Sequence, residues 1–107
     1  GDIVIVHGDE IVETDAKGII IGHEHPAITI REGSKWEKYK CFLKGKWYQK
    51  ELIAVPSFNP LLEGTDVLQG HMLSPFLDDV GKFNVYIVNR GEVYDFGRVE
   101  KIKEKFQ

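Results

Sequence analysis

Three histidines of this chain directly follow short apolar segments, where side chains at strand ends could meet. One belongs to His7-Gly8-Asp9 and the other two to Gly22-His23-Glu24-His25, and each motif follows a run of Ile and Val. Side chains two apart on a strand point to the same face, so His23 and His25 are predicted to project together, with Glu24 turned aside. Imidazole is the commonest metal ligand among side chains, and this spacing therefore indicates a metal site.

The chemistry open to such a site is broad. Three imidazoles suit zinc, manganese, iron or nickel, and three protein ligands with an open position are typical of a catalytic site. An isolated His-x-His is as easily two polar residues at a strand end, but His7 after a second apolar run favours metal. Gly22 is expected to allow close access to the backbone. A cupin-like barrel would need a glutamate a few residues after His-x-His on the same strand. The first acidic residue after His25 is Glu32, which is poorly placed for that role. Rings closer than about 8 Å would support a shared site.

Other polar residues leave two interpretations open. Asp9 and Glu24 could orient the imidazoles by hydrogen bonding or could be solvated loop acids. Asn59 could line the edge of a substrate site, although Asn-Pro is first a turn signal. No catalytic nucleophile is assigned, because the serines lack an elbow motif and Cys41 has no neighbouring base. His71, in a glycine-rich loop, is expected at the surface.

Composition limits the class of protein. The chain has 107 residues, 42% of them hydrophobic, and 1–107 is interpreted as one unit or as part of a larger domain. A net charge of -3 excludes a basic nucleic-acid footprint, although a metal pair could itself attract phosphate. The single cysteine excludes an internal disulfide and is consistent with the cytoplasm. No apolar stretch is long enough to span a membrane.

The pattern along the chain predicts a mostly β structure. Buried strands are expected over 3–7 and 18–22, with a loop or helical turn over 9–17 between them and a third strand over 27–31. Segments 39–44 and 46–55 are predicted to form an antiparallel hairpin around Gly45. Segment 56–81 is predicted to be irregular.

The last third of the chain should form a hairpin and a helix. Strands are expected over 83–89 and 92–97, joined at Arg90-Gly91, and the spacing of Val99 and Ile102 favours a short helix or frayed end over 98–107. The aromatic residues Trp36, Trp47 and Tyr48 could stack on bases, but strand aromatics more often pack in the core or against a neighbouring strand.

Two of the motifs carry a resemblance. Gly22-His23-Glu24-His25 resembles the closing GHxH motif of the calcineurin-like metallophosphoesterases, and His7-Gly8-Asp9 resembles their preceding single-histidine motif. With the stretches GIIIGHEHPAITI, KCFLKGKW, VPSFNPLLEGTDV and LSPFL, the chain from Asp2 to about Gly97 resembles one branch of that superfamily. That branch is the archaeal and bacterial phosphoesterases related to DNA-repair exonucleases.

The resemblance implies a fold, a reaction and a set of ligands. The fold would be α/β, this chain being the C-terminal, mostly β part of a two-sheet sandwich flanked by helices. His7 and His23 would bind one metal of a pair and His25 the other. The family hydrolyses phosphoesters, including nucleic-acid or nucleotide phosphodiesters, with a metal-bridging hydroxide, and the paired cations (Mn, Zn, Fe or Ni) neutralise charge on the phosphate.

The chain departs from the family pattern at its start. The DxH, GDxxD and GNHD/E motifs, which normally precede the one at His7, do not occur here. The opening Gly1-Asp2, without Met, is consistent with a truncated or processed chain. We therefore expect the chain alone to be inactive and to need the N-terminal half of the domain, or to self-associate through exposed strand faces. The alternative is a small β module with one three-histidine metal site and no catalysis.

Overall fold

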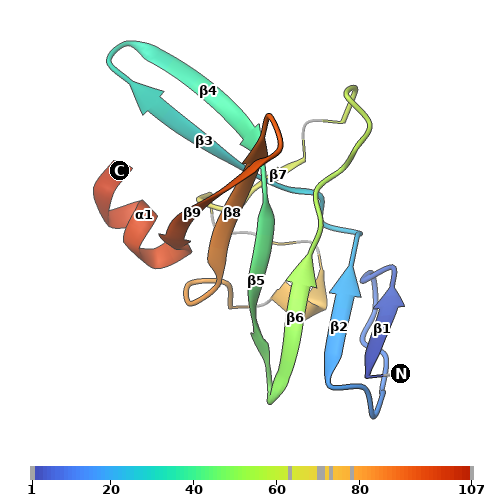
Figure 1. Ribbon diagram of the computed structural model, residues 1–107. Coiled ribbons are helices and arrows are strands. Elements are labelled where there is room, and N and C mark those ends of the chain that lie inside the picture. The colour runs from blue at the N-terminus through green and yellow to red at the C-terminus, as the bar shows by residue number, and fades with distance from the viewer. Residues whose placement is uncertain (1, 63, 70–71, 73, 78, 107) are drawn as a thin grey trace.

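Two β-sheets form the framework of the structure. The computed structural model describes residues 2–62, 64–69, 72, 74–77 and 79–106. The larger sheet has the order β1-β2-β6-β5-β8-β9 and the smaller one the order β4-β3-β7 (Figure 1). The strands of the larger sheet are β1 (Ile3–Val6), β2 (Gly18–Ile21), β6 (Lys50–Ala54), β5 (Phe42–Trp47), β8 (Asn84–Asn89) and β9 (Glu92–Arg98). Those of the smaller sheet are β4 (Lys35–Lys40), β3 (Pro26–Glu32) and β7 (Thr65–Asp66).

The strands β1, β2 and β6 are parallel neighbours, whereas β5, β8 and β9 are paired antiparallel. The carboxyl ends of β1, β2 and β6 therefore lie at one edge of the sheet, and the loops that follow these strands meet there. Because His7 and His23 are in the first two of these loops, the strand pairing places them side by side. The adjacent strand ends expected from the sequence are thus confirmed.

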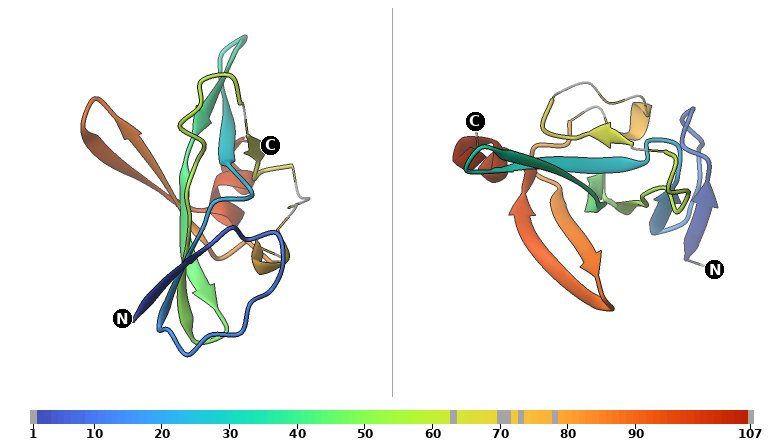
Figure 2. Two further views of the ribbon diagram at one scale, coloured as in Figure 1. Left: turned by 90° about the vertical axis from the view of Figure 1, so that its right-hand side faces the viewer. Right: turned by 90° about the horizontal axis from the view of Figure 1, so that it is seen from above.

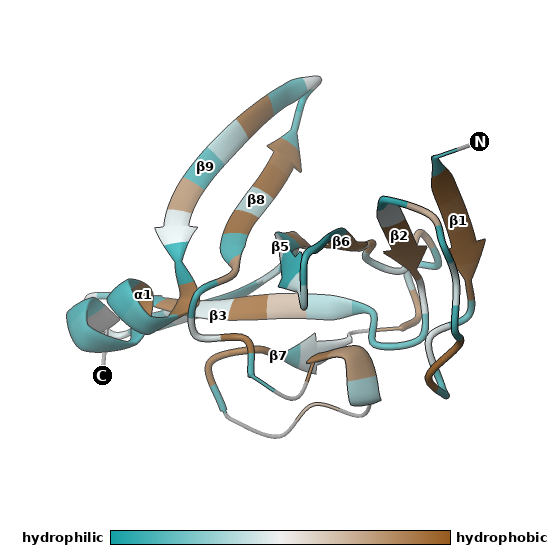
Figure 3. Cartoon of the chain, turned by 90° about the horizontal axis from the view of Figure 1, so that it is seen from below, coloured by the Kyte–Doolittle hydropathy of each residue, from teal (hydrophilic) through white to brown (hydrophobic). Residues whose placement is uncertain are grey.

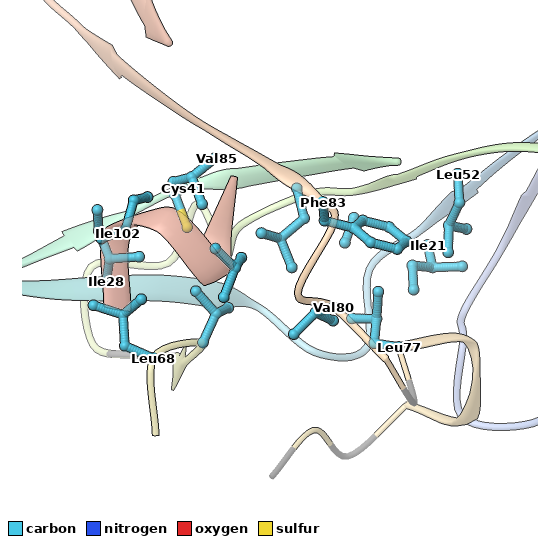
Figure 4. Packing of buried hydrophobic residues seen from close by; sticks show 14 of the residues in the cluster. Ile21, Ile28, Cys41, Leu52, Leu68, Leu77, Val80, Phe83, Val85 and Ile102 are labelled. Atoms are coloured by element: carbon cyan, nitrogen blue, oxygen red, sulfur yellow. The ribbon is translucent and has the colours of Figure 1, made fainter. Parts of the chain in front are cut away.

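The core lies between the sheets. Alternate residues of β2 and β6, Ile19, Ile21, Leu52 and Ala54, are buried on the inner face of the larger sheet. The 3-10 turn η1 (Pro75–Leu77) and the helix α1 (Val99–Phe106) close this core. Figure 4 shows Leu77 beside Ile21 at one end of the cluster, with Ile102 of α1 near Cys41 at the other. The short helix at the end of the chain is confirmed.

Cys41 marks the point where the chain passes from one sheet to the other. β4 ends at Lys40 and β5 begins at Phe42, while the Cys41 amide donates a hydrogen bond to the Pro26 carbonyl, 3.0 Å away. The single strand predicted over 39–44 is therefore wrong, because buried Cys41 takes part in both layers. A strand over 35–40, paired with β3 through a turn at Gly33, was not predicted.

The predicted turn at Gly45 is also wrong. Gly45 lies within β5 opposite Leu52, and the chain turns at Tyr48-Gln49. A Cβ at position 45 would lie 2.6 Å from the buried Phe83 ring, so the glycine accommodates packing rather than a turn. The closing hairpin is confirmed, with Arg90 and Gly91 both at positive φ. This hairpin stands away from the rest of the molecule (Figure 2).

The strand β1 is not buried as predicted. Its Val4 and Val6 pack against the core, but Ile3 and Ile5 are 64% and 77% exposed. Among the described strands β1 pairs only with β2, so its outer face and one edge are uncovered. Figure 3 shows this hydrophobic strand at the border of the sheet.

The remaining expectations are confirmed in outline. Residues 9–17 form a loop, β2 and β3 occupy the predicted segments, and 56–81 is irregular in its described part apart from β7 and η1. Trp47 packs against Phe76, with ring centroids 4.8 Å apart. Trp36 and Tyr48 are exposed and do not pack in the core. Trp36 does pack across the strands, because the guanidinium of its partner Arg31 lies over its ring, and the Tyr48 ring contacts that of Trp47. Within the described part of the chain, no helix has the length and apolar character needed to cross a membrane.

Candidate functional site

His7 and His23 are in direct contact where β1 and β2 end. The His7 carbonyl accepts hydrogen bonds from the amides of Gly22, at 3.1 Å, and His23, at 2.7 Å, which extends the strand pairing into the loops. The two imidazole rings are 4.8 Å apart between centroids, at an interplanar angle of 64°. Nδ1 of His23 lies 3.0 Å from Nε2 of His7, so one ring donates a hydrogen bond to the other.

Gly8 permits this close approach. Its φ of +101° disfavours any residue with a side chain, and a Cβ there would lie 2.9 Å from Cβ of Ile21. The glycine predicted to be needed for access, Gly22, has ordinary packing, since the one described atom within 4 Å of a Cβ there would be Val55 Cγ2 at 3.8 Å. Packing therefore requires glycine after His7 rather than before His23.

His25 takes a different position from the one that strand alternation predicts. β2 ends at Ile21, and His25 has a positive φ of 51°, so the two-residue period does not extend to it. Its carbonyl accepts a hydrogen bond from the Thr65 amide at 3.0 Å. Its Nδ1 atom is buried and has no hydrogen-bond partner among the described residues. A buried polar atom of this kind calls for a ligand or other partner.

Glu24 is buried, with 1% of its surface exposed, and points into the protein. Its Oε1 atom accepts a hydrogen bond from the Ser74 amide at 2.7 Å, while Oε2 is buried without a partner in the described part of the chain. The hydroxyl of Ser74 donates to the Gly8 carbonyl at 2.5 Å. Sequence reasoning missed Ser74, for which the only local signal is the turn-forming Ser-Pro pair.

The other two predicted residues lie nearer the surface. Asp9 is exposed in the loop after β1. Asn59 follows β6 and forms the predicted turn, since its Oδ1 accepts a hydrogen bond from the Leu61 amide at 3.0 Å. Lys40 donates to the Asn59 carbonyl at 2.6 Å and ties the turn to β4. Asn59 thus lies in a loop at the same edge of the sheet as the histidines. His71 lies outside the described residues.

The contact between His7 and His23 fits two ligands of one metal ion. With metal–nitrogen bonds of about 2.1 Å, two ligand nitrogens are about 3.0 Å apart at a right angle and about 3.4 Å apart at the tetrahedral angle. The observed separation of 3.0 Å is within this geometry. In the described ranges, no three His, Cys, Asp or Glu side chains gather closely enough to hold a metal ion. The fold therefore brings together two of the three predicted ligands.

The surroundings of Cys41 and of the buried serine Ser57 favour a role in packing and hydrogen bonding over one as a nucleophile. Burial, and secondarily the Asp66 carboxylate, raise the pKa of the Cys41 thiol to about 12. The thiolate that a nucleophilic cysteine needs is therefore scarce at neutral pH. The buried hydroxyl of Ser57 accepts a hydrogen bond from the Asn59 amide at 3.1 Å.

The chemistry at this edge is thus that of paired imidazoles beside a buried carboxyl group. Comparison with protein-family models, with curated proteins and with solved structures gives no significant match to this chain.

Proposed function

We propose that this chain provides metal-binding histidines of a calcineurin-like metallophosphoesterase, a hydrolase that acts on phosphoesters. The observation that carries the proposal is the contact of His7 and His23 at the carboxyl edge of two parallel strands, with ring nitrogens 3.0 Å apart. The motif resemblance of these residues supports it. The proposed fold is the mostly β part of the metallophosphatase sandwich, which agrees with the two facing sheets.

The chain's own residues provide binding and orientation. A divalent ion held there (manganese, zinc, iron or nickel) would supply a Lewis acid and lower the pKa of coordinated water. His7 and His23 present one nitrogen each, and the main-chain bonds between their loops fix the distance between the rings. In the resemblance, His25 serves a second ion, and its buried, unpartnered Nδ1 is consistent with a ligand role.

The proposal includes partners and a location. The bridging aspartate and the histidine near the leaving group would come from the N-terminal half of the same domain, outside these 107 residues. The substrate class is a phosphoester, and nucleotide or nucleic-acid phosphodiesters are the first to test. The net charge of -3 means that the ions rather than the surface would attract the phosphate. The free thiol of Cys41 is consistent with the cytoplasm, and a membrane is not among the proposed partners.

Metal binding tests the proposal directly. Manganese and zinc titrations of the chain by calorimetry should show binding tighter than about 1 mM. His7→Ala and His23→Ala should each weaken it about tenfold or more, because each removes one nitrogen ligand. Asp9→Asn is the matched control, since it changes an exposed neighbour of the same motif and should have little effect. Absence of binding, or unchanged binding in both histidine variants, would contradict the proposal.

Hydrolysis separates the enzyme from the alternative, a metal-binding β module without catalysis. The chain alone with manganese should not hydrolyse bis(p-nitrophenyl) phosphate, because it lacks the DxH and GNHD/E motifs. A longer product that carries those motifs ahead of Gly1 should hydrolyse it and should lose activity on His23→Ala. Turnover by the 107-residue chain would show that the missing motifs are not required. Metal binding without turnover in the longer product would favour the module.

A further inference from the structure

The buried carboxyl group of Glu24 joins three segments that are far apart in the sequence. Its Oε1 accepts the Ser74 amide hydrogen at 2.7 Å, and the Ser74 hydroxyl donates to the Gly8 carbonyl at 2.5 Å. Glu24 is adjacent to His23, and Gly8 is adjacent to His7. We call this series of two bonds the Glu24–Ser74–Gly8 link. It connects the two histidine loops through the protein interior, while the imidazoles meet each other directly.

The link is anchored in the core. Ser74 is 2% exposed and directly precedes the turn η1, whose Phe76 and Leu77 are buried. The Leu77 amide donates to the Ser74 carbonyl at 3.0 Å, and the Phe76 amide approaches the Ser74 hydroxyl at 3.3 Å. Ser74 is therefore held in place independently of the histidines, and it can fix the position of both loops.

A carboxyl group at this position costs stability. Burial of a polar side chain is unfavourable unless its atoms are hydrogen-bonded, and Oε2 of Glu24 has no partner within the described residues. An apolar residue of similar size would avoid that cost, yet it could not accept the Ser74 amide hydrogen. Packing alone thus does not account for glutamate between His23 and His25.

We propose that Glu24 and Ser74 are positioning residues that hold His7 and His23 in register with each other. The proposal rests on the metal-binding function proposed above, because its consequence is a pre-arranged pair of ligand nitrogens. Without the link, the described contacts between the His7 and His23 loops would be the main-chain bonds to the His7 carbonyl, the packing of Gly8 against Ile21 and the contact of the two rings themselves. The rings could then adopt other rotamers, and metal binding would have to order them.

The experiment compares two buried serines at the same edge of the sheet. Ser74→Ala removes the donor to Gly8 but keeps the amide that Glu24 accepts. Ser57→Ala is the matched control, because it removes a buried hydroxyl in the loop after β6 whose hydrogen bond, among the described residues, is to the Asn59 amide and not to either histidine segment. Long-range ¹H–¹⁵N NMR spectra report the imidazole nitrogens of His7 and His23, and a cobalt titration measures affinity.

Ser74→Ala should shift the His7 and His23 nitrogen resonances and weaken cobalt binding about tenfold. Ser57→Ala should change both by less than about twofold, even if it lowers the melting temperature equally. Glu24→Gln keeps an acceptor and should retain the wild-type imidazole spectrum, whereas Glu24→Leu should behave like Ser74→Ala.

The outcomes separate the two proposals. Unchanged imidazole spectra and cobalt affinity in Ser74→Ala would overturn the positioning role while the metal site stands. If the imidazole spectra shift in Ser74→Ala but the wild-type chain binds no cobalt, the positioning role is supported and the metal site is contradicted. If Ser57→Ala and Ser74→Ala change the imidazole spectra and the cobalt affinity equally, the effect of Ser74 is one of general stability, and the positioning role is overturned.

Discussion

At the scale of single residues, the site depends on one glycine with a specific backbone conformation. Gly8 has a φ of +101°, and its Cα faces Ile21 so closely that a Cβ would lie 2.9 Å from Cβ of Ile21. Its carbonyl also receives the Ser74 hydroxyl. The positive φ of Gly8 and its close approach to Ile21 are the two features that allow His7 to lie beside His23.

Gly8→Ala should therefore destabilise the fold by about 3 kcal/mol, the sum of a left-handed backbone cost and overpacking. Gly33→Ala is the matched control, because Gly33 also has a positive φ but no described atom within 4 Å of an added Cβ. It should cost only about 1 kcal/mol. Urea unfolding of both variants checks the difference, and equal losses would contradict the packing argument at Gly8.

The Cys41 thiol should make stability depend on pH in alkaline solution. Its pKa is raised from 9.0 to about 12 in the folded chain, so the unfolded chain loses the proton first as pH rises. The contribution is fully present below pH 9 and is lost between pH 9 and about 12. From pH 8.5 to 10 this thiol should lower the free energy of unfolding by about 1 kcal/mol.

Cys41→Ala separates this effect from the titration of lysines and tyrosines. Its overall stability falls because it leaves a cavity, but its pH slope between 8.5 and 10 should be smaller than that of the wild type. Chemical unfolding at each pH measures both quantities. Identical slopes would show that the thiol does not ionise differently in the folded and unfolded chains.

At the scale of elements, the strand β5 shows how packing can reverse a turn signal. Gly45 lies opposite Leu52 in the middle of the β5–β6 pair, and Phe83 occupies the space where a Cβ would be. The chain turns instead at Tyr48, which has a φ of 56°. Cross-strand pairing over five residue pairs, from Leu43–Ala54 to Trp47–Lys50, outweighs the local cost at Tyr48.

Gly45→Ala should cost about 2 kcal/mol through overpacking against Phe83. Phe83→Leu makes room, so the double variant should recover about 1 kcal/mol relative to the sum of the single changes. Denaturation of the four members of this cycle provides the coupling energy. Additive losses would contradict the packing of Phe83 against Gly45 as the reason for glycine at this position.

At the scale of the whole molecule, the outer face of the larger sheet is apolar and uncovered. The strand register aligns Ile5, Ile20 and Ile53 in one row across β1, β2 and β6. A shallow hollow along this row has Lys17, Lys44 and Glu51 among its other lining residues. Parallel strands are normally covered on both faces, so this face is where the proposed N-terminal half would pack.

The chain by itself should self-associate through this face and the free edge of β1. Its weight-average sedimentation coefficient should rise with concentration. Ile5→Lys, which places a charge on the row, should suppress the rise. Leu61→Lys is the control, because Leu61 is 87% exposed on the loop after β6 and off the sheet. If both variants suppress the rise equally, the association is nonspecific and does not depend on this face of the sheet.

The sequence alone determined the features that depend on neighbouring residues. The runs of Ile and Val predicted β1 and β2, the Arg90-Gly91 pair predicted the closing hairpin, and the spacing of Val99 and Ile102 predicted α1. The placement of His7 and His23 after two such runs also predicted that their side chains would meet, although the parallel pairing that brings them together is known only from the structure.

Only the tertiary structure decided the features that depend on distant residues. The Ser74 amide bonds to Glu24 across 50 residues, and its hydroxyl bonds to Gly8 across 66. The change of sheet at Cys41 and the space that Phe83 denies to residue 45 arise in the same way. Local periodicity fixes which side of a strand is apolar, but it cannot fix which segment packs there. Burial of Glu24 and exposure of Ile5 therefore followed from packing between layers rather than from their own sequence neighbours.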